Sequence, residues 1–224
     1  FSLCLIAVFV LSLFSFPQRE VKAIVSSVII NELDSDTPTT PTNDNAEFIE
    51  LFDGGVGSTS LNGLVLVLFN GGVANDASYA SYDLDGYSTD ANGYFILGSP
   101  EITNRDYAIG PNIIQNGADA AALFVGDATS FPNGTALTTT GILDAIVYDT
   151  SDADDTGLLA LLNAGQPQVD ENSRSLGATD SNQRCPNGAG GERNTDTYIQ
   201  DTPTPKAANI CPGDTTAPTL TITG

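Results

Sequence analysis

The sequence predicts an all-β protein, a Greek-key β-sandwich with one short inserted helix. Short runs of β-branched and aromatic residues recur along the chain, and clusters of Asp, Thr, Pro and Gly separate them, as turns do. No helical segments alternate with these runs, as they would in a parallel sheet. The hydrophobic content of 41%, with 22 Gly and 12 Pro, is typical of a folded, turn-rich domain.

Six strands are expected, with a seventh around Tyr107–Ile109. They are Ser27–Leu33, Ala46–Phe52, Leu64–Phe69, Tyr94–Leu97, Ala120–Val125 and Gly141–Tyr148. In the second, alternation places Phe48, Glu50 and Phe52 on one face of the sheet. The third is continuously apolar, which suits a strand buried on both faces.

One helix is expected over Thr156–Ala164. Asp154 or Asp155 can cap its start, four leucines populate its turns, and Gly165 can end it. From Gln166 to Asn209 the chain shows no such pattern, so this region is expected to be irregular.

The first residues resemble a secretory signal peptide whose start is truncated. Almost every residue from Leu3 to Phe16 is apolar, Pro17 ends the run, and small residues around Ala23 suit cleavage. A membrane anchor is the alternative, but the run is shorter than the ~20 residues that span a bilayer. We therefore expect a signal peptide over residues 1–23, secretion or display at the cell surface, and no membrane association after cleavage.

The chain is strongly acidic, with 7 Lys and Arg, 28 Asp and Glu, no His, and a net charge of −21. Removing residues 1–23 brings the charge to −22. Binding to nucleic-acid phosphates needs Lys and Arg to displace counterions, so direct nucleic-acid binding is not expected.

Two cysteines, Cys185 and Cys211, remain beyond the predicted signal peptide. An even number in an exported chain favours a disulfide between them, which would contribute on the order of 3 kcal/mol. Two separate thiols, or pairing with another molecule, are the alternatives. Metal binding by two cysteines without His is less favoured.

Four motifs, taken in order, resemble the lamin-tail domain family, and no one of them is specific alone. They are Ile30–Leu33, Glu47–Leu51, Ser60–Leu64 and Asp144–Tyr148. The segment Pro203–Asn209 resembles the closing T-P-G-x-x-N of the family, with Lys206 where Gly is usual. The likeness covers most of the chain from Val28 to Asn209. It implies an immunoglobulin-like sandwich of the bacterial type found beside secreted nucleases and phosphatases of the endonuclease/exonuclease/phosphatase superfamily, with long insertions around residues 79–92 and 149–170.

The expected organisation is a signal peptide, a lamin-tail-like domain over residues 24–212, and a linker over 213–224 that begins another immunoglobulin-like domain. The alternating Thr-Leu-Thr-Ile-Thr after Pro218 favours this interpretation, and a disordered tail is the alternative.

Candidate catalytic residues are few. Without His, neither a Ser–His nor a Cys–His arrangement can form. Glu32, Glu47 and Glu50 can approach one another across neighbouring strands, as paired carboxylates do in glycoside hydrolysis. The simpler interpretation is that these are outward-facing acids on strands, so no enzyme activity is expected from this region.

The best cofactor candidate is Ca²⁺. Asp83, Asp85 and Asp90 place hard oxygen donors around a turn at Gly86, as calcium requires. An Asp- and Gly-rich hairpin is the alternative. A second acidic group, around Asp149–Asp155, is more simply a helix cap.

These observations lead to two functional hypotheses. The first is a non-catalytic module that tethers or positions a larger secreted or surface protein, with the following domains of the same chain as partners. The second is a calcium-dependent adhesion or glycan-binding domain, in which Tyr79, Tyr82 and Tyr87 border the acidic loop and stack on sugar rings. The protein or glycan ligand is not specified by the sequence.

Overall fold

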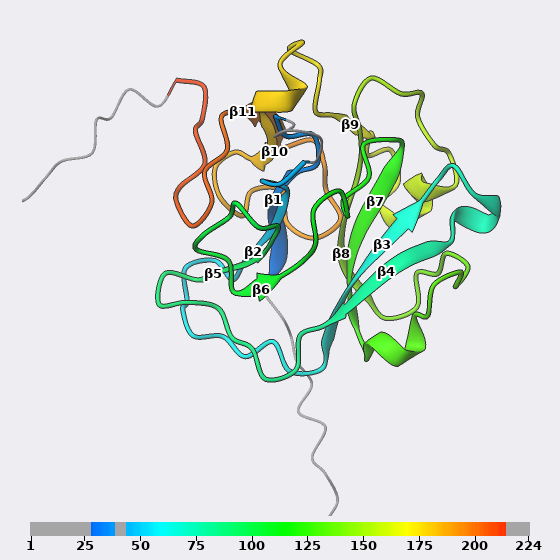
Figure 1. The fold of residues 1–224 in the computed structure, drawn as a ribbon, viewed down its shortest axis with the longest axis horizontal. Coiled ribbons are helices and arrows are strands. Elements are labelled where there is room, and N and C mark those ends of the chain that lie inside the picture. The colour runs from blue at the N-terminus through cyan, green and yellow to red at the C-terminus, as the bar shows by residue number, and fades with distance from the viewer. Residues whose placement is uncertain (1–27, 39–43, 214–224) are drawn as a thin grey trace, which may run out of the picture.

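Two β-sheets packed face to face form the protein (Figure 1). The structure is a computed structural model, and it describes residues 28–38 and 44–213. The order in the first sheet is β11 (Tyr198–Asp201), β10 (Ser181–Arg184), β1 (Ile29–Asp34), β2 (Phe48–Phe52), β5 (Tyr94–Gly98) and β6 (Tyr107–Ala108). The order in the second is β4 (Ser78–Asp83), β3 (Leu64–Asn70), β7 (Asp119–Val125), β8 (Ile142–Asp149) and β9 (Val169–Asp170).

Nearly all strand pairs are antiparallel, with β5–β6 and β8–β9 as the parallel exceptions. The predicted all-β sandwich is therefore confirmed. The immunoglobulin-like Greek-key order stays a prediction. All six expected strands are present, and the seventh is β6.

The main core lies between the two sheets. It combines alternate residues of β1 and β2, such as Ile30 and Ile49, with Leu66 of β3 and Ile146 of β8. The remaining side chains of β3 point the other way, and there Val67 belongs to a second apolar cluster on the outer face of the second sheet. β3 is thus buried on both faces, as its continuous apolar sequence predicts.

The expected helix is a single 3-10 turn, η3 (Leu158–Leu161), and therefore shorter than predicted. Asp155 does cap it, because its Oδ1 accepts hydrogen bonds from the backbone N–H groups of Gly157 at 2.8 Å and Leu158 at 3.0 Å. The turn buries Leu158 and Leu161 in the second apolar cluster. Three other 3-10 turns are η1 (Ala74–Asp76), η2 (Ala128–Ser130) and η4 (Gly177–Thr179).

The region from Gln166 to Asn209 is not irregular, contrary to expectation. It contains β9, β10 and β11, and β10 pairs directly with β1. The sequence of β10, Ser-Asn-Gln-Arg, has no apolar residue, yet all four residues are buried. Burial of polar side chains cannot be inferred from hydrophobic periodicity, which explains why this strand is not predicted.

The predicted signal peptide and the segment after Gly213 lie outside the described residues, so both stay predictions. Within the ranges 28–38 and 44–213, no helix has the length and apolar character needed to cross a bilayer.

Candidate functional site

Glu32, Glu47 and Glu50 are completely buried, which corrects the expectation that they face solvent. Glu32 and Glu50 lie directly opposite each other on β1 and β2, next to a register shift between Ile30 and Glu32. Burial raises the pKa of Glu32, and it raises the pKa of Glu50 to about 8. The outer face of the first sheet therefore holds a pair of desolvated carboxyl groups.

The C-terminal segment, residues 202–211, covers this pair. Thr204 donates to Glu32 from its backbone N at 2.8 Å and from Oγ1 at 2.9 Å. The backbone N of Lys206 donates to Glu50 Oε2 at 2.7 Å, and Asn31 Nδ2 donates to Glu50 Oε1 at 2.9 Å. The chain's own donors thus occupy the carboxylate oxygens, and they are long-range contacts that close the fold.

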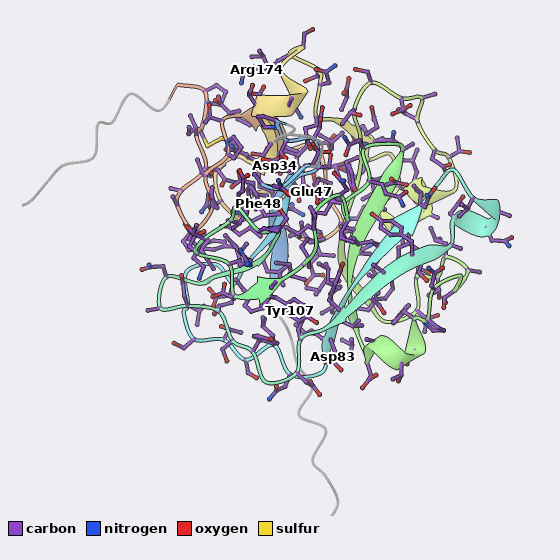
Figure 2. The ribbon with its side chains drawn as sticks, viewed as in Figure 1. Asp34, Glu47, Phe48, Asp83, Tyr107 and Arg174 are labelled. Carbon is purple, nitrogen blue, oxygen red and sulfur yellow. A yellow bond between two sulfur atoms is a disulfide. The ribbon has the colours of Figure 1, made fainter. Side chains whose placement is uncertain are left out.

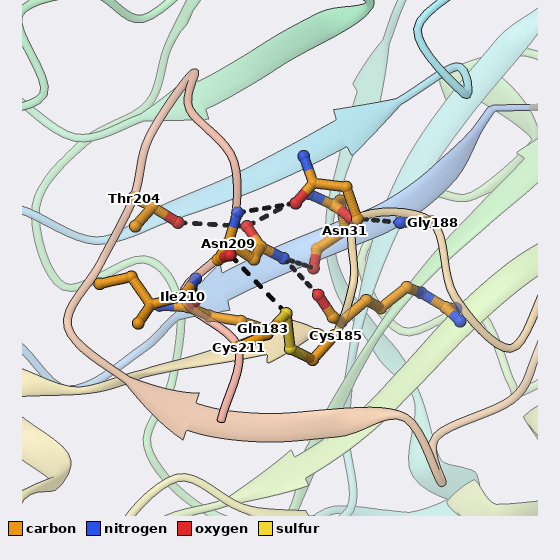
Figure 3. Close-up of a disulfide and its surroundings, with 10 residues drawn as sticks. Asn31, Gln183, Cys185, Gly188, Thr204, Asn209, Ile210 and Cys211 are labelled. Carbon is orange, nitrogen blue, oxygen red and sulfur yellow. Dashed lines mark hydrogen bonds between the residues drawn. A yellow bond between two sulfur atoms is a disulfide. The ribbon is translucent and has the colours of Figure 1, made fainter. Parts of the chain in front are cut away.

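A disulfide and several amide side chains fasten the same segment (Figure 3). Cys185 and Cys211 are joined with a Cα–Cα distance of 5.5 Å, which confirms the predicted pairing. Next to the disulfide in sequence, Asn209 Nδ2 donates to the carbonyl of Arg184 at 2.7 Å, and the N–H of Ile210 donates to Gln183 Oε1 at 3.1 Å. The segment is bound to β10 as well as to β1.

Lys206 keeps the backbone conformation that glycine favours. Its φ is 61°, in the left-handed region, so the departure from Gly at this position does not abolish the turn. Its Nζ lies 2.7 Å from Asp106 Oδ1 and 3.8 Å from Asp90 Oδ2. The lysine therefore links the C-terminal segment to the loops on either side of β5.

A second group of buried acids lies next to the first, around Asp34. Asp34 and Phe48 are cross-strand neighbours, and Figure 2 shows them with Glu47. Glu171 accepts hydrogen bonds from the backbone N–H groups of Ser35 at 3.2 Å and Asp36 at 2.9 Å. Burial raises the pKa of Glu47 and of Glu171 to about 8, and burial together with the neighbouring carboxylates raises the pKa of Asp34 well above its ordinary value.

Two oxygens of this group have no hydrogen-bond partner among the residues that the structure describes. They are Asp34 Oδ1 and Glu47 Oε1, both inaccessible to solvent. Buried polar atoms without partners are rare because desolvation is not repaid, so each is a candidate for protonation or for binding. Sequence reasoning did not single out Asp34, which ends β1 directly after the Ile30–Leu33 motif.

One buried carboxylate has a buried cation. Arg184 and Asp144 are each 0% exposed, with 3.0 Å between Nη2 and Oδ2. Arg184 Nε also donates to the carbonyl of Ile30 at 2.7 Å, and its guanidinium lies 4.8 Å from the centre of the Tyr198 ring. This ion pair joins β1, β8 and β10 across the sandwich.

The three predicted calcium ligands lie at the end of β4 and in the connection from β4 in the second sheet to β5 in the first, and they do not form a ligand set. Asp83 Oδ1 accepts from the N–H of Asp85 at 2.8 Å, and Asp90 Oδ1 accepts from the N–H of Asn92 at 2.8 Å. Asp85 Oδ1 accepts from the N–H of Gly63. Over residues 28–38 and 44–213, no group of three or more acidic, His or Cys side chains is arranged to hold a metal ion. Calcium binding stays a prediction.

Three tyrosines gather where the edge strands of the two sheets meet. The ring centre of Tyr107 on β6 lies 5.6 Å from that of Tyr82 on β4 and 5.3 Å from that of Tyr87. Tyr107 and Asp83 are labelled at this edge in Figure 2. Tyr79 does not join them, because its hydroxyl accepts from the N–H of Gln115 at 3.3 Å and burial raises its pKa. We call Tyr82, Tyr87 and Tyr107 the tyrosine cluster.

No protein-family model, curated protein or solved structure matches this chain. The resemblance to lamin-tail domains therefore stays a prediction. The candidate functions depend on the geometry described above.

Proposed function

We propose that this chain is a non-catalytic binding module of a larger extracellular protein, which it tethers or positions. The observation that carries the proposal is the covering of Glu32 and Glu50 by the C-terminal segment. Both carboxyl groups are 0% exposed and receive hydrogen bonds from Thr204 and Lys206. A general acid or base must lie within hydrogen-bond reach of its substrate. A substrate cannot reach these two carboxyl groups, because both are buried.

An extracellular setting is supported by the Cys185–Cys211 disulfide, because such bonds persist mainly in oxidising compartments. The net charge of −21 keeps the surface soluble and repels nucleic acid and anionic membranes. The lamin-tail resemblance points the same way, towards a module attached to a secreted nuclease or phosphatase.

Turnover assays test this proposal. The purified chain is incubated with DNA, a phosphate monoester and a panel of oligosaccharides, with and without divalent metal ions. We expect no turnover above that of a heat-denatured control. Turnover that is lost in Glu32→Gln or Glu50→Gln, with the melting temperature retained, would overturn the proposal.

A second candidate, glycan binding, is favoured by the tyrosine cluster. Aromatic rings beside carboxylates suit sugars, which present apolar faces and hydroxyl groups, and Tyr87 is 37% exposed. A carbohydrate array probed with and without calcium tests this function. Binding that Tyr87→Ala removes and Val73→Ala, at an exposed position elsewhere, retains would support it. An array with no binding would leave the tethering function alone.

A further inference from the structure

A cavity of about 280 Å³ lies on the outer face of the first sheet. Phe48 and Ile102, which belong to a small apolar cluster on that face, form one part of its wall. Pro203 and Pro205 of the C-terminal segment form another. The cavity is at the small end of the range for ligand sites, so its volume suits a single side chain rather than a larger ligand.

One carboxyl group interrupts this apolar wall. Asp34 lines the cavity and is only 4% exposed, and its Oδ1 has no hydrogen-bond partner among the described residues. The groups that interact electrostatically with Asp34 are all acids. They are Glu171, Glu32, Asp36 and Glu47. Each of these carboxyl groups makes the electrostatic potential at this end of the cavity more negative when it ionises.

Residues 28–38 and 44–213 do not supply a cation here. The described part contains five basic residues, and each has other partners. Arg174, Arg184 and Lys206 form ion pairs with other aspartates, and Arg105 and Arg193 donate to backbone carbonyl groups. A buried carboxylate without a cation is unfavourable, so a positively charged ligand gains more here than on an ordinary acidic surface.

We propose that this cavity binds the side chain of a lysine from a partner protein. The four methylene groups would lie against Phe48, Ile102 and the two prolines, and the ammonium group would donate to Asp34. Lysine suits the cavity better than arginine, whose five donors in a rigid fork need several acceptors. A quaternary ammonium group is disfavoured because Phe48 is the only aromatic residue among the described residues of the wall, whereas such groups bind between several rings.

This inference deepens the proposed function, since it gives the chemistry of the partner. Only one part of it rests on that function, namely that the bound lysine belongs to another protein. The first probe is n-butylammonium, which reproduces a lysine side chain from Cβ to Nζ. Its binding to the purified chain is measured by calorimetry and by NMR shifts, beside n-butanol as the neutral equivalent. We expect a dissociation constant on the order of millimolar for n-butylammonium and at least tenfold weaker binding of n-butanol, roughly as lost charge pairing predicts.

Two variants with a matched control locate the site. Asp34→Asn removes the charge, and Ala178→Trp places a large ring at an exposed position on the cavity wall while keeping the carboxylate. Each should weaken n-butylammonium binding at least about tenfold. Leu176→Trp places the same ring on an exposed residue of the same loop that does not line the cavity, and it should leave binding unchanged. Melting temperatures of all three establish that the fold is retained.

The proposal is overturned if n-butanol binds as tightly as n-butylammonium, if neither Asp34→Asn nor Ala178→Trp weakens binding, or if no binding is detected. Displacement of n-butylammonium by millimolar calcium would assign the carboxylate to a metal ion and would also overturn it. If the proposal holds, a peptide with one lysine should bind to the chain more tightly than the same peptide with its lysine Nε-acetylated. These results are independent of the turnover assays, so failure of the lysine site is distinguishable from failure of the proposed function.

Discussion

Asp144 and Asp34 are both buried aspartates on strands of the same sandwich, yet their surroundings are opposite. Asp144 has Arg184 at 3.0 Å and also accepts a hydrogen bond from the backbone N–H of Ile30 at 2.8 Å. Asp34 has acidic neighbours and an oxygen without a partner among the described residues. The first is completed by the fold itself, whereas the second remains open to a proton or a ligand.

This difference shows how to tell a structural buried acid from a functional one when both are equally buried. A buried charge that is paired and hydrogen-bonded joins the elements that surround it, here β1, β8 and β10. A buried acid without such partners lowers stability when ionised, and proteins retain such groups mainly at functional sites. Burial alone does not distinguish the two cases, and the partners of each oxygen do.

The largest expected effect is on the paired aspartate. Arg184→Met leaves Asp144 buried without its cation, and we expect a loss of about 3–5 kcal/mol in the free energy of unfolding. This would lower the melting temperature by roughly 10 °C or more, as measured by calorimetry. The double variant Arg184→Met/Asp144→Leu should recover part of the loss, because it removes the unpaired charge. A melting temperature within 1 °C of the original in Arg184→Met would show that the ion pair does not hold the strands.

An intermediate effect is expected from Glu47, a buried acid of the group around Asp34, and it depends on pH. Burial raises the pKa of Glu47 from 4.5 to about 8, so between these values the folded state holds a proton that the unfolded state has released. Stability is therefore fully present below pH 4.5 and is lost as the pH rises through about 8. The chain should melt at a higher temperature at pH 5 than at pH 8, roughly by several degrees.

Glu47→Gln sharpens this prediction. The neutral side chain should raise the melting temperature by roughly 2–6 °C at pH 8 and change it little at pH 5, since Glu47 is already protonated there. Glu192→Gln, at an exposed position, is the matched control and should have no such pH-dependent effect. If the variant and the original chain respond equally to pH, Glu47 is ionised in the folded state and the group around Asp34 does not hold the proton assigned to it.

The smallest expected effect concerns Asp83, Asp85 and Asp90 around the turn at Gly86, which extend the comparison to the surface. Millimolar calcium should raise the melting temperature by roughly 1–2 °C over excess chelator, because extracellular calcium sites are weak. Sodium chloride at matched ionic strength controls for screening. Combined Asp83→Asn, Asp85→Asn and Asp90→Asn should abolish the rise. An unchanged melting temperature in the original chain would reject calcium at this loop.

Much of the fold can be predicted from the sequence, because six of the strands carry an apolar signal. The continuous apolar run of β3 correctly predicts burial on both faces, whereas the alternation in β2 does not show that its Glu50 face is buried as well. β10 could not be predicted, since its buried residues are all polar and gain their partners only from distant segments. β4 was missed for a related reason: its Ser and Ala residues interrupt the pattern that Tyr79 and Tyr82 begin.

The candidate site was only partly predictable. Periodicity places Glu32 and Glu50 on neighbouring strands, but their burial depends on Thr204, which is 172 residues from Glu32 in the sequence. The disulfide was predictable from the count of cysteines. Asp34 was not predictable, because what distinguishes it is an oxygen without a hydrogen-bond partner among the described residues. A sequence does not show which contacts a side chain lacks.

The sheet edges have a consequence of their own. At one edge of each sheet the last strand, β6 or β9, is only two residues long and runs parallel to its neighbour. Such short edges offer few free backbone groups to another chain, and short edge strands are one way in which natural sheets avoid edge-to-edge aggregation. These two edges thereby limit the backbone pairing that a second copy of the chain could make there.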